Sequence, residues 1–282
     1  MYMRTIQFES IAEAVAKAAI DAARVLPDDV LAALQRAHDR ETFPRARSIL
    51  ADLIENARIA REDCMPLCQD TGLAVAFVRM GSGVAVEGGT IADAINEGVR
   101  RGYQRGYLRK SILADPLRRV NTGDNTPAII HFEPAEGDVL SIDLMAKGGG
   151  SENMSGIAML APSQGRQGVI DFVVNKVRTA GGNPCPPIVV GVGIGGSFER
   201  AALLAKKSLL RRLDQPHPDP DLARLEDDLL QAINATGVGP QGLGGDTTAL
   251  GVHVETHPCH IASLPVAVNI ECHAHRTRHI EL

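Results

Sequence analysis

The sequence predicts a mixed α/β (α+β) fold, with a helical N-terminal region over residues 1–62 followed by a sheet-containing region over residues 63–282. Three observations support this. Apolar residues recur at helical spacing from Ser10 to about Ala60, short valine-rich runs bounded by glycine recur after them, and helical patterns fall between some of those runs. At 282 residues the chain is long enough for one large domain or two modest ones. We expect the second region to be one continuous domain.

The N-terminal region is predicted to contain three helices. Apolar residues between Ile11 and Ala19 recur every three or four positions, and Pro27 opens a second helix, as proline does at a first helical position. The third helix is predicted over residues 46–61, and it ends in a loop that contains Cys64 and Pro66. The first cysteines therefore follow a helix directly.

Predicted strands and helices mix along the rest of the chain. Strands are expected at residues 73–78, 128–132, 139–145, 188–192, 247–255 and 264–270. Helices are expected at residues 91–103, 168–177, 198–211 and 221–233. Residues 214–221 hold three prolines and are predicted to form an exposed connection. These patterns leave the order of the strands in the sheet open.

Composition excludes several classes of function. The formal net charge is −5 and Lys and Arg are dispersed, so no basic surface for nucleic acid is expected. No stretch approaches the roughly 18 apolar residues of a membrane helix, and residues 1–10 do not resemble a signal peptide. Five cysteines at irregular spacing fit a reducing compartment better than a disulfide framework. We therefore expect a cytoplasmic protein without membrane contacts.

A glycine-rich run after the predicted strand at 188–192 matches the dinucleotide fingerprint literally, through Gly191, Gly193 and Gly196. That fingerprint also needs a second strand ending in an acidic residue roughly 20 positions on, and no strand precedes Asp214. A tight strand-to-helix turn with positive φ is the simpler interpretation.

A second glycine run, at residues 147–150, follows another predicted strand. Consecutive glycines let backbone N–H groups point at an anion, so this run could form a nest facing a carboxylate or a sulfide, or a plain flexible turn. It is not a phosphate-binding P-loop, because Lys147 precedes the glycines instead of following them.

Three cysteines, Cys68, Cys185 and Cys272, each lie at the end of a predicted element. Spacing alone would leave them as buried thiols, since structural zinc and ferredoxin sites show ligand pairs close together. Their surroundings are more suggestive: prolines flank Cys185 on both sides, and Gln69 and Asp70 follow Cys68. A cubane cluster held by three thiolates keeps one iron open to a substrate, which indicates catalysis and not electron transfer.

Five motifs occur in the order seen in the α subunits of class I (iron–sulfur) fumarases and L-tartrate dehydratases, and the chain resembles that family over roughly residues 10–282. The motifs are Pro-Leu-Cys-Gln-Asp-Thr-Gly at 66–72, Asn-Thr-Gly-Asp-Asn-Thr-Pro-Ala at 121–128, Lys-Gly-Gly-Gly-Ser at 147–151, Cys-Pro-Pro at 185–187 and Cys-His-Ala-His-Arg at 272–276. Five such motifs in one order are far less expected by chance than any one of them.

The resemblance implies a hydro-lyase with a [4Fe-4S] cluster on Cys68, Cys185 and Cys272. It further implies that Gln69, Arg109, Gly149 and His260 bind a dicarboxylate substrate, and that Asp70 and His260 are catalytic. Hydration of fumarate to (S)-malate, a step of the tricarboxylic acid cycle, is the expected reaction, with dehydration of tartrate to oxaloacetate as the alternative. Because the chain ends at Leu282, soon after the third cysteine motif, we expect a separate β subunit in an α2β2 heterotetramer.

Two other interpretations remain open. Cys64 and Cys68 with His257, Cys259 and His260 could form a zinc site of a metallohydrolase, although this leaves Cys185 and Cys272 unexplained. A cluster could also serve a non-catalytic sensor, although the lack of a basic surface argues against a sensor that binds DNA.

Overall fold

The computed structural model describes residues 3–282 and divides them into two compact units. The first unit comprises residues 3–26, 57–149 and 276–282, and the second comprises residues 27–56 and 150–275. Each unit has its own four-stranded sheet and its own apolar core. The structure distributes the helical N-terminal residues over both units, because α1 (Phe8–Arg24) packs in the first and α2 (Asp28–Arg40) in the second, while α3 (Pro44–Glu62) runs across the boundary.

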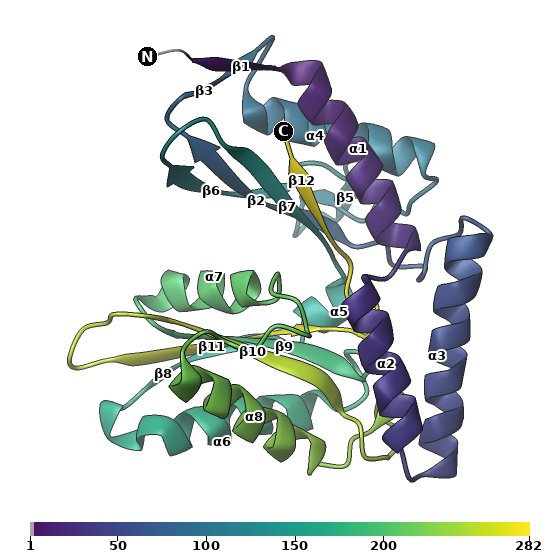
Figure 1. Cartoon of the computed structure of the whole chain (residues 1–282), viewed down its shortest axis with the longest axis vertical. Helices are drawn as coiled ribbons and strands as arrows, with labels where there is room; N and C mark the ends of the chain where they lie inside the picture. Colours follow the sequence, from purple (N-terminus) through teal and green to yellow (C-terminus); the bar gives the residue numbers. More distant parts are fainter. Residues whose placement is uncertain (1–2) are drawn as a thin grey trace. The chain divides into compact units, whose positions relative to one another are not determined.

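The first unit is built on a mixed sheet with the strand order β12-β7-β2-β6 (Figure 1). Its strands are β2 (Leu73–Gly81), β6 (Ile129–Ala135), β7 (Leu140–Lys147) and β12 (Thr277–Glu281). β2 pairs in parallel with β6 and antiparallel with β7, and β7 pairs antiparallel with β12. Two small pairs complete the unit: β1 (Arg4–Gln7) with β3 (Val84–Glu87), and β4 (Leu113–Asp115) with β5 (Val120–Asn121).

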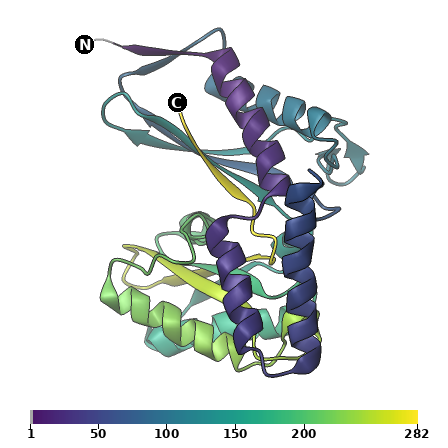
Figure 2. The same cartoon turned by 45° about the vertical axis from the view of Figure 1, so that its right-hand side comes forward.

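Two helices, α1 and α4 (Ile91–Arg105), run side by side against this sheet, as both views show (Figures 1 and 2). They pack closely because Gly98 and Gly102 of α4 face α1, where a Cβ would come within 2.6 Å and 2.9 Å of the carbonyls of Ala12 and Ala16. Burial of the shared apolar face provides the driving force for this packing. The core includes Ile11, Val15, Ala76, Val78, Ile95, Val99 and Leu144.

The second unit contains a mixed sheet with the order β10-β9-β11-β8. Its strands are β8 (Gly156–Leu160), β9 (Ile188–Gly195), β10 (Ala249–His257) and β11 (Leu264–Glu271). β9 and β10 are parallel, whereas β11 runs antiparallel to both β9 and β8. The short helix α5 (Gly149–Glu152) leads from the first unit into this sheet.

Helices cover both faces of the second sheet (Figure 1). Residues of α6 (Gly165–Ala180) and α8 (Pro220–Asn234) form one apolar core with Val190, Val192 and Val268 of the sheet. On the other face, α7 (Phe198–Ser208) packs through Ala201 and Ala205.

The close fit of α7 explains two of the glycines in β9. A Cβ at Gly191 would lie 2.0 Å from the carbonyl oxygen of Ala205, and one at Gly193 would lie 2.1 Å from that of Ala201. No side chain fits there, so these glycines allow the helix backbone to rest directly on the strand.

The mixed α/β prediction is confirmed, and every predicted strand and helix overlaps an observed one. The strands β1, β3, β4, β5, β8 and β12 were not predicted. β12 shows why: of its five residues only Ile280 is buried, so the segment carries no apolar pattern, and its pairing with β7 makes it a strand. Among residues 3–282, no helix combines the length and the apolar character needed to cross a bilayer.

Replacing Gly193 with alanine is expected to lower the free energy of unfolding of the second unit by about 1–3 kcal/mol, because the added methyl must displace the α7 backbone. Urea titration measures the loss. Gly237→Asn is the matched control: Gly237 has a φ of +67° and no atom within 4 Å of an added Cβ, and asparagine tolerates that conformation. Equal stability of Gly193→Ala and the control would contradict the packing argument.

Candidate functional site

The loop that carries Cys68 lies in the first unit, between α3 and β2. Cys68 and Gln69 are exposed, whereas Asp70 is partly buried. The Oδ1 atom of Asp70 accepts a hydrogen bond from the backbone N–H of Gly72 at 3.0 Å, and Oδ2 accepts one from the N–H of Gly149 at 2.9 Å. Two backbone donors, one to each oxygen, therefore orient this carboxylate.

The glycine run at 147–150 lies beside the same loop. The backbone N–H of Gly149 faces a carboxylate, and that carboxylate is the side chain of Asp70. Lys147 is fully buried, and its carbonyl oxygen would lie only 2.7 Å from a Cβ at Gly72. Arg276 is also buried, and its Nη1 donates to the carbonyl oxygen of Asp70 at 2.5 Å. The Asp70 loop is therefore fixed through both its side chain and its backbone.

Arg109 lies in the loop between α4 and β4 of the same unit, and its side chain is exposed. Its backbone carbonyl accepts a hydrogen bond from Thr71 Oγ1 at 3.0 Å. The structure thus links the Arg109 loop directly to the loop that carries Cys68, Gln69 and Asp70. Five of the predicted site residues therefore lie in the first unit: Cys68, Gln69, Asp70, Arg109 and Gly149.

In the second unit the structure brings Cys185 and Cys272 together. Cys185 lies just before β9 in a left-handed conformation, with φ of 54°, and its N–H donates to the carbonyl of Gly182 at 3.0 Å. The residue after Cys272, His273, contacts the carbonyl oxygen of Cys185 through Nδ1 at 3.0 Å. Gln241 supports the same loop, because its Nε2 donates to the carbonyl of Pro186 at 2.8 Å.

His260 does not lie near these two cysteines. Cys185 precedes β9 and Cys272 follows β11, and because these strands are antiparallel both cysteines lie at the same end of the sheet. His260 precedes β11, so it lies at the opposite end, about 25 Å away for a strand of this length.

At that far end His260 is exposed and lines an open depression of about 570 Å³ with Arg200, His257 and Cys259. Its Nδ1 accepts a hydrogen bond from the N–H of Ala262 at 3.1 Å. A neutral ring with this contact carries its proton on Nε2, which leaves Nε2–H as a donor.

The chemistry of the three cysteines fits an iron–sulfur cluster. None of the three forms a disulfide bond; Cys68 and Cys185 are exposed and Cys272 is partly exposed. Thiolates are the usual ligands of such clusters. Within residues 3–282, no three side chains of His, Cys, Asp or Glu gather closely enough to hold a single metal ion. Cluster thiolates need not gather so closely, since each binds a different iron.

The zinc interpretation finds no support among the described residues. Within residues 3–282, no three of these five side chains form a group that could hold a metal ion. In the second unit, His257 Nδ1 contacts the carbonyl of Pro258 at 2.8 Å and the thiol of Cys259 donates to the carbonyl of Ser263 at 3.3 Å. Both side chains therefore contact backbone carbonyls of the loop between β10 and β11.

The dinucleotide-like glycine run also has a structural explanation. Gly195 and Gly196 have φ of +89° and +69°, and a Cβ at Gly195 would lie 2.0 Å from the carbonyl of His257. No strand occurs between Ser208 and Pro220, so the acidic strand end that the fingerprint requires is missing from this described segment. Gly191 and Gly193 lie within β9, and the end of the run leads into the turn from β9 to α7.

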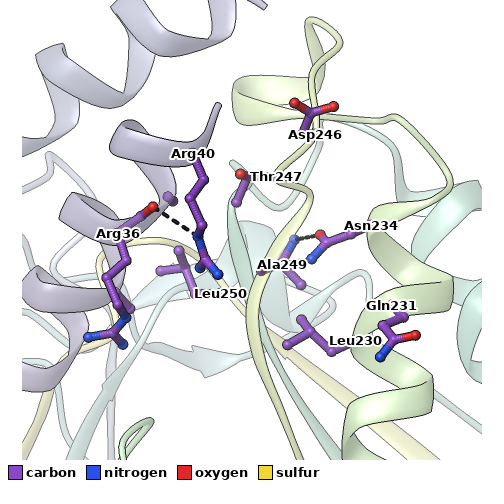
Figure 3. Close-up of a pocket in the computed structure, with 11 residues that line it drawn as sticks. Arg36, Arg40, Leu230, Gln231, Asn234, Asp246, Thr247, Ala249 and Leu250 are labelled. Atoms are coloured by element: carbon purple, nitrogen blue, oxygen red, sulfur yellow. Dashed lines mark hydrogen bonds between the residues drawn. The ribbon is translucent and has the colours of Figure 1, made fainter. Parts of the chain in front are cut away.

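A cavity of about 440 Å³ lies elsewhere in the second unit, between α2, α8 and the start of β10 (Figure 3). Arg36 and Arg40 line it from α2, and Gln231 and Asn234 line it from α8. Arg40 Nε donates to the carbonyl of Arg36 at 3.2 Å. None of the predicted site residues lines this cavity, so it is separate from the cysteine loops.

Two supporting residues were missed at the sequence level although they lie inside the quoted cysteine motif. Arg276 and His273 hold Asp70 and Cys185 respectively, by contacts to backbone carbonyls. Their position near Cys272 was the only sequence feature that pointed to them. Their contacts with Cys185 and Asp70 join residues far apart in the sequence, and a local pattern does not predict such contacts.

The chain matches the family model described as Fumarate hydratase (Fumerase) over residues 12–281. It is 43% identical to a protein of Methanocaldococcus jannaschii provisionally named L(+)-tartrate dehydratase subunit alpha, over 94% of this chain and 95% of that protein. It is also 35% identical to the L(+)-tartrate dehydratase subunit alpha of Escherichia coli strain K12, over 89% of this chain and 84% of that protein.

A buried histidine in the second sheet gives a pH-dependent stability. His253 of β10 is 4% exposed, and neither ring nitrogen has a hydrogen-bond partner among residues 3–282. Burial, with the positive charge of Arg211 and the nearby His275, lowers the pKa of His253 from 6.5 to about 3. Below pH 6.5 the unfolded chain binds a proton that the folded chain cannot, so stability is lost as the pH falls from 6.5 toward 3.

We expect the free energy of unfolding to fall by about 2 kcal/mol more between pH 7 and pH 4.5 in the natural chain than in His253→Gln. Urea titrations across this range measure the slope. The exposed His257→Gln provides the control and should keep the slope of the natural chain. A His253→Gln slope equal to that of the control would show that the buried imidazole does not cause the effect.

Proposed function

Because this chain belongs to the fumarate hydratase (Fumerase) family and is a hydro-lyase, we propose that it is the α subunit of an iron–sulfur enzyme that hydrates fumarate reversibly to (S)-malate. The observation that carries the proposal is the Asp70 carboxylate, which two backbone N–H groups orient in the loop of Cys68. A fixed carboxylate next to a cysteine loop is the arrangement expected of a proton-transfer group beside a cluster-bound substrate.

Cys68, Cys185 and Cys272 are the proposed ligands of a [4Fe-4S] cluster. When bound through three thiolates, such a cluster supplies an open iron that acts as a Lewis acid toward the substrate. The exposed thiols and the tie between Cys185 and His273 support this assignment.

The remaining residues of the first unit would bind and orient the dicarboxylate. Arg109 is exposed, and its planar guanidinium can hold a carboxylate through two parallel hydrogen bonds. Gln69, between Cys68 and Asp70, offers an amide to the substrate. Asp70 would give or take the proton at its carboxylate. The N–H of Gly149 donates to Asp70, so Gly149 would act on the substrate through that residue.

His260 keeps its proposed role as a donor to a substrate carboxylate, through Nε2–H. Its place at the far end of the sheet from Cys185 and Cys272 means that it cannot reach a substrate held beside those two cysteines of its own chain. A catalytic contribution from His260 therefore requires a centre to which another chain contributes.

The proposed partner is a β subunit. The relatives in M. jannaschii and E. coli carry the name subunit alpha, which supports a second kind of subunit here. We propose an α2β2 assembly in the cytoplasm, where reducing conditions keep the thiols available as ligands, and a role in the tricarboxylic acid cycle.

Dehydration of L(+)-tartrate to oxaloacetate is the second candidate activity, and the names of the same relatives favour it. The substrates of the two reactions differ in their hydroxyl groups, and a site discriminates strongly only where it provides a partner for such a group.

The first test compares the chain alone with the chain purified anaerobically together with its β subunit. We expect fumarate hydration by the complex and little turnover by the chain alone, because both subunits contribute to the centre. Assays with fumarate and with L(+)-tartrate on the same preparation separate the two candidate activities. Full activity of the lone chain would reject the shared centre, and a brown complex inactive on every dicarboxylate would indicate a sensor.

Asp70→Asn tests the proton-transfer role. The amide keeps the size of the side chain but cannot act as a carboxylate base, so kcat is expected to fall by at least about 100-fold while the cluster stays bound. Iron content and the visible absorbance band check the cluster, and initial rates of hydration give kcat.

Cys185→Ser is expected to abolish the visible absorbance band of the anaerobic protein and to lower its iron content, because an alcohol replaces the thiolate ligand. Cys259→Ser provides the control, since the Cys259 thiol donates to the carbonyl of Ser263 in a distant loop. Loss of the band in both variants, or in neither, would contradict the ligand assignment.

A further inference from the structure

The segment 121–125 forms several hydrogen bonds with the loop that carries Arg109. Asn121 Nδ2 donates to the carbonyl of Lys110 at 3.0 Å, and the N–H of Thr122 donates to the carbonyl of Ile112 at 2.9 Å. Asn125 adds a third hydrogen bond between the two segments, because its Oδ1 accepts from the N–H of Ser111 at 2.7 Å. The segment therefore contacts each of the three residues that follow Arg109.

Asn125 also reaches the loop of the proposed proton-transfer residue. Its Nδ2 donates to the carbonyl of Gly72 at 3.2 Å, while its Oδ1 holds Ser111. Gly72 lies two residues after Asp70, and Ser111 lies two residues after Arg109. One fully buried amide thus bridges the two loops, at the same distance in sequence from each functional side chain.

We propose that Asn125 is a positioning residue that sets the distance and orientation between the Asp70 carboxylate and the Arg109 guanidinium. This rests on the proposed hydration of a dicarboxylate, in which Arg109 holds one carboxylate of the substrate and Asp70 transfers a proton. A substrate of fixed length can meet both groups only if their spacing is fixed.

Neighbouring contacts limit movement of the bridge. Tyr103 is 1% exposed, and its hydroxyl donates toward the carbonyls of Thr71 and Gly72, both at 2.9 Å. Burial raises the pKa of Tyr103 well above its usual value, so the phenol remains a donor. Thr71, itself 2% exposed, makes the second tie between the loops through its hydrogen bond to the carbonyl of Arg109.

The backbone conformation at position 125 explains why asparagine occurs there. Its φ is +63°, in the left-handed region that asparagine tolerates better than most residues. Asp124 stabilises the turn by accepting hydrogen bonds from Thr126 N and Oγ1 and from Arg100 of α4. The turn therefore presents an amide, with one donor and one acceptor in use, at a fully buried position.

The test uses the complex of the chain with its β subunit and the variant Asn125→Gly. Glycine keeps the left-handed backbone but removes the bridge. We expect KM for the dicarboxylate to rise about 10-fold because the Arg109 clamp loses its alignment, with kcat within about 3-fold and cluster content unchanged. Arg119→Gly is the matched control, since Arg119 is exposed and also has a positive φ, of 59°. Equal kinetics of the two variants would overturn the proposal.

A double-mutant cycle with Arg109→Lys distinguishes positioning from a general loss of stability. If Asn125 acts through Arg109, Asn125→Gly should raise KM clearly less in the Arg109→Lys background than in the natural chain. Equal factors in both backgrounds would overturn the proposal.

Thr71→Val provides a second variant that does not depend on the turn at Asn125. It removes the other tie to the Arg109 carbonyl with little change in size, and the same rise in KM is expected. An unchanged KM in Thr71→Val would overturn the positioning argument. If the natural complex hydrates no dicarboxylate, the proposed function fails; if the natural complex is active and these variants resemble the control, only the positioning role fails.

Discussion

The constraint on which the loop of Cys68 and Asp70 depends is the close approach of Gly72 to the end of β7. A Cβ at this position would lie 2.7 Å from the carbonyl oxygen of Lys147, and the φ of +80° is one that side-chain-bearing residues rarely adopt. Gly72 N donates to Asp70, and Gly72 O accepts from Tyr103 and Asn125. One glycine backbone thus connects the proposed proton-transfer residue with the buried polar network behind it.

The second unit uses the same principle for a different purpose. Gly191 and Gly193 let α7 rest on β9, and Gly195 allows the close approach of His257, the last residue of β10 before the loop that carries His260. At the other end of the sheet, prolines and a left-handed cysteine conformation shape the loop of Cys185, which His273 ties to the segment of Cys272. Close backbone contacts therefore help to shape both cysteine-bearing regions, together with the side chains of Arg276 and His273.

This division of residues clarifies what each unit contributes to a hydro-lyase. The first unit holds Cys68, the oriented Asp70 carboxylate and the exposed Arg109, while the second holds Cys185 and Cys272. The units are interleaved in sequence, since the chain returns to the first unit at Arg276, the last residue of the third cysteine motif. Arg276 then holds the carbonyl of Asp70, so the residue that ends this motif supports the loop of the first cysteine.

The sequence by itself determined the fold class, most elements and the family, because helical and strand periodicity and short ordered motifs are local properties of the chain. It also singled out Asp70 and the glycine run at 147–150 as separate candidate features, without placing them next to each other. Only the tertiary structure decided that Gly149 donates to Asp70, that Asn125 bridges two loops, and that His260 lies far from Cys272 in the sheet. These relations depend on strand register and on hydrogen bonds between residues distant in sequence, and local pattern carries no information about either.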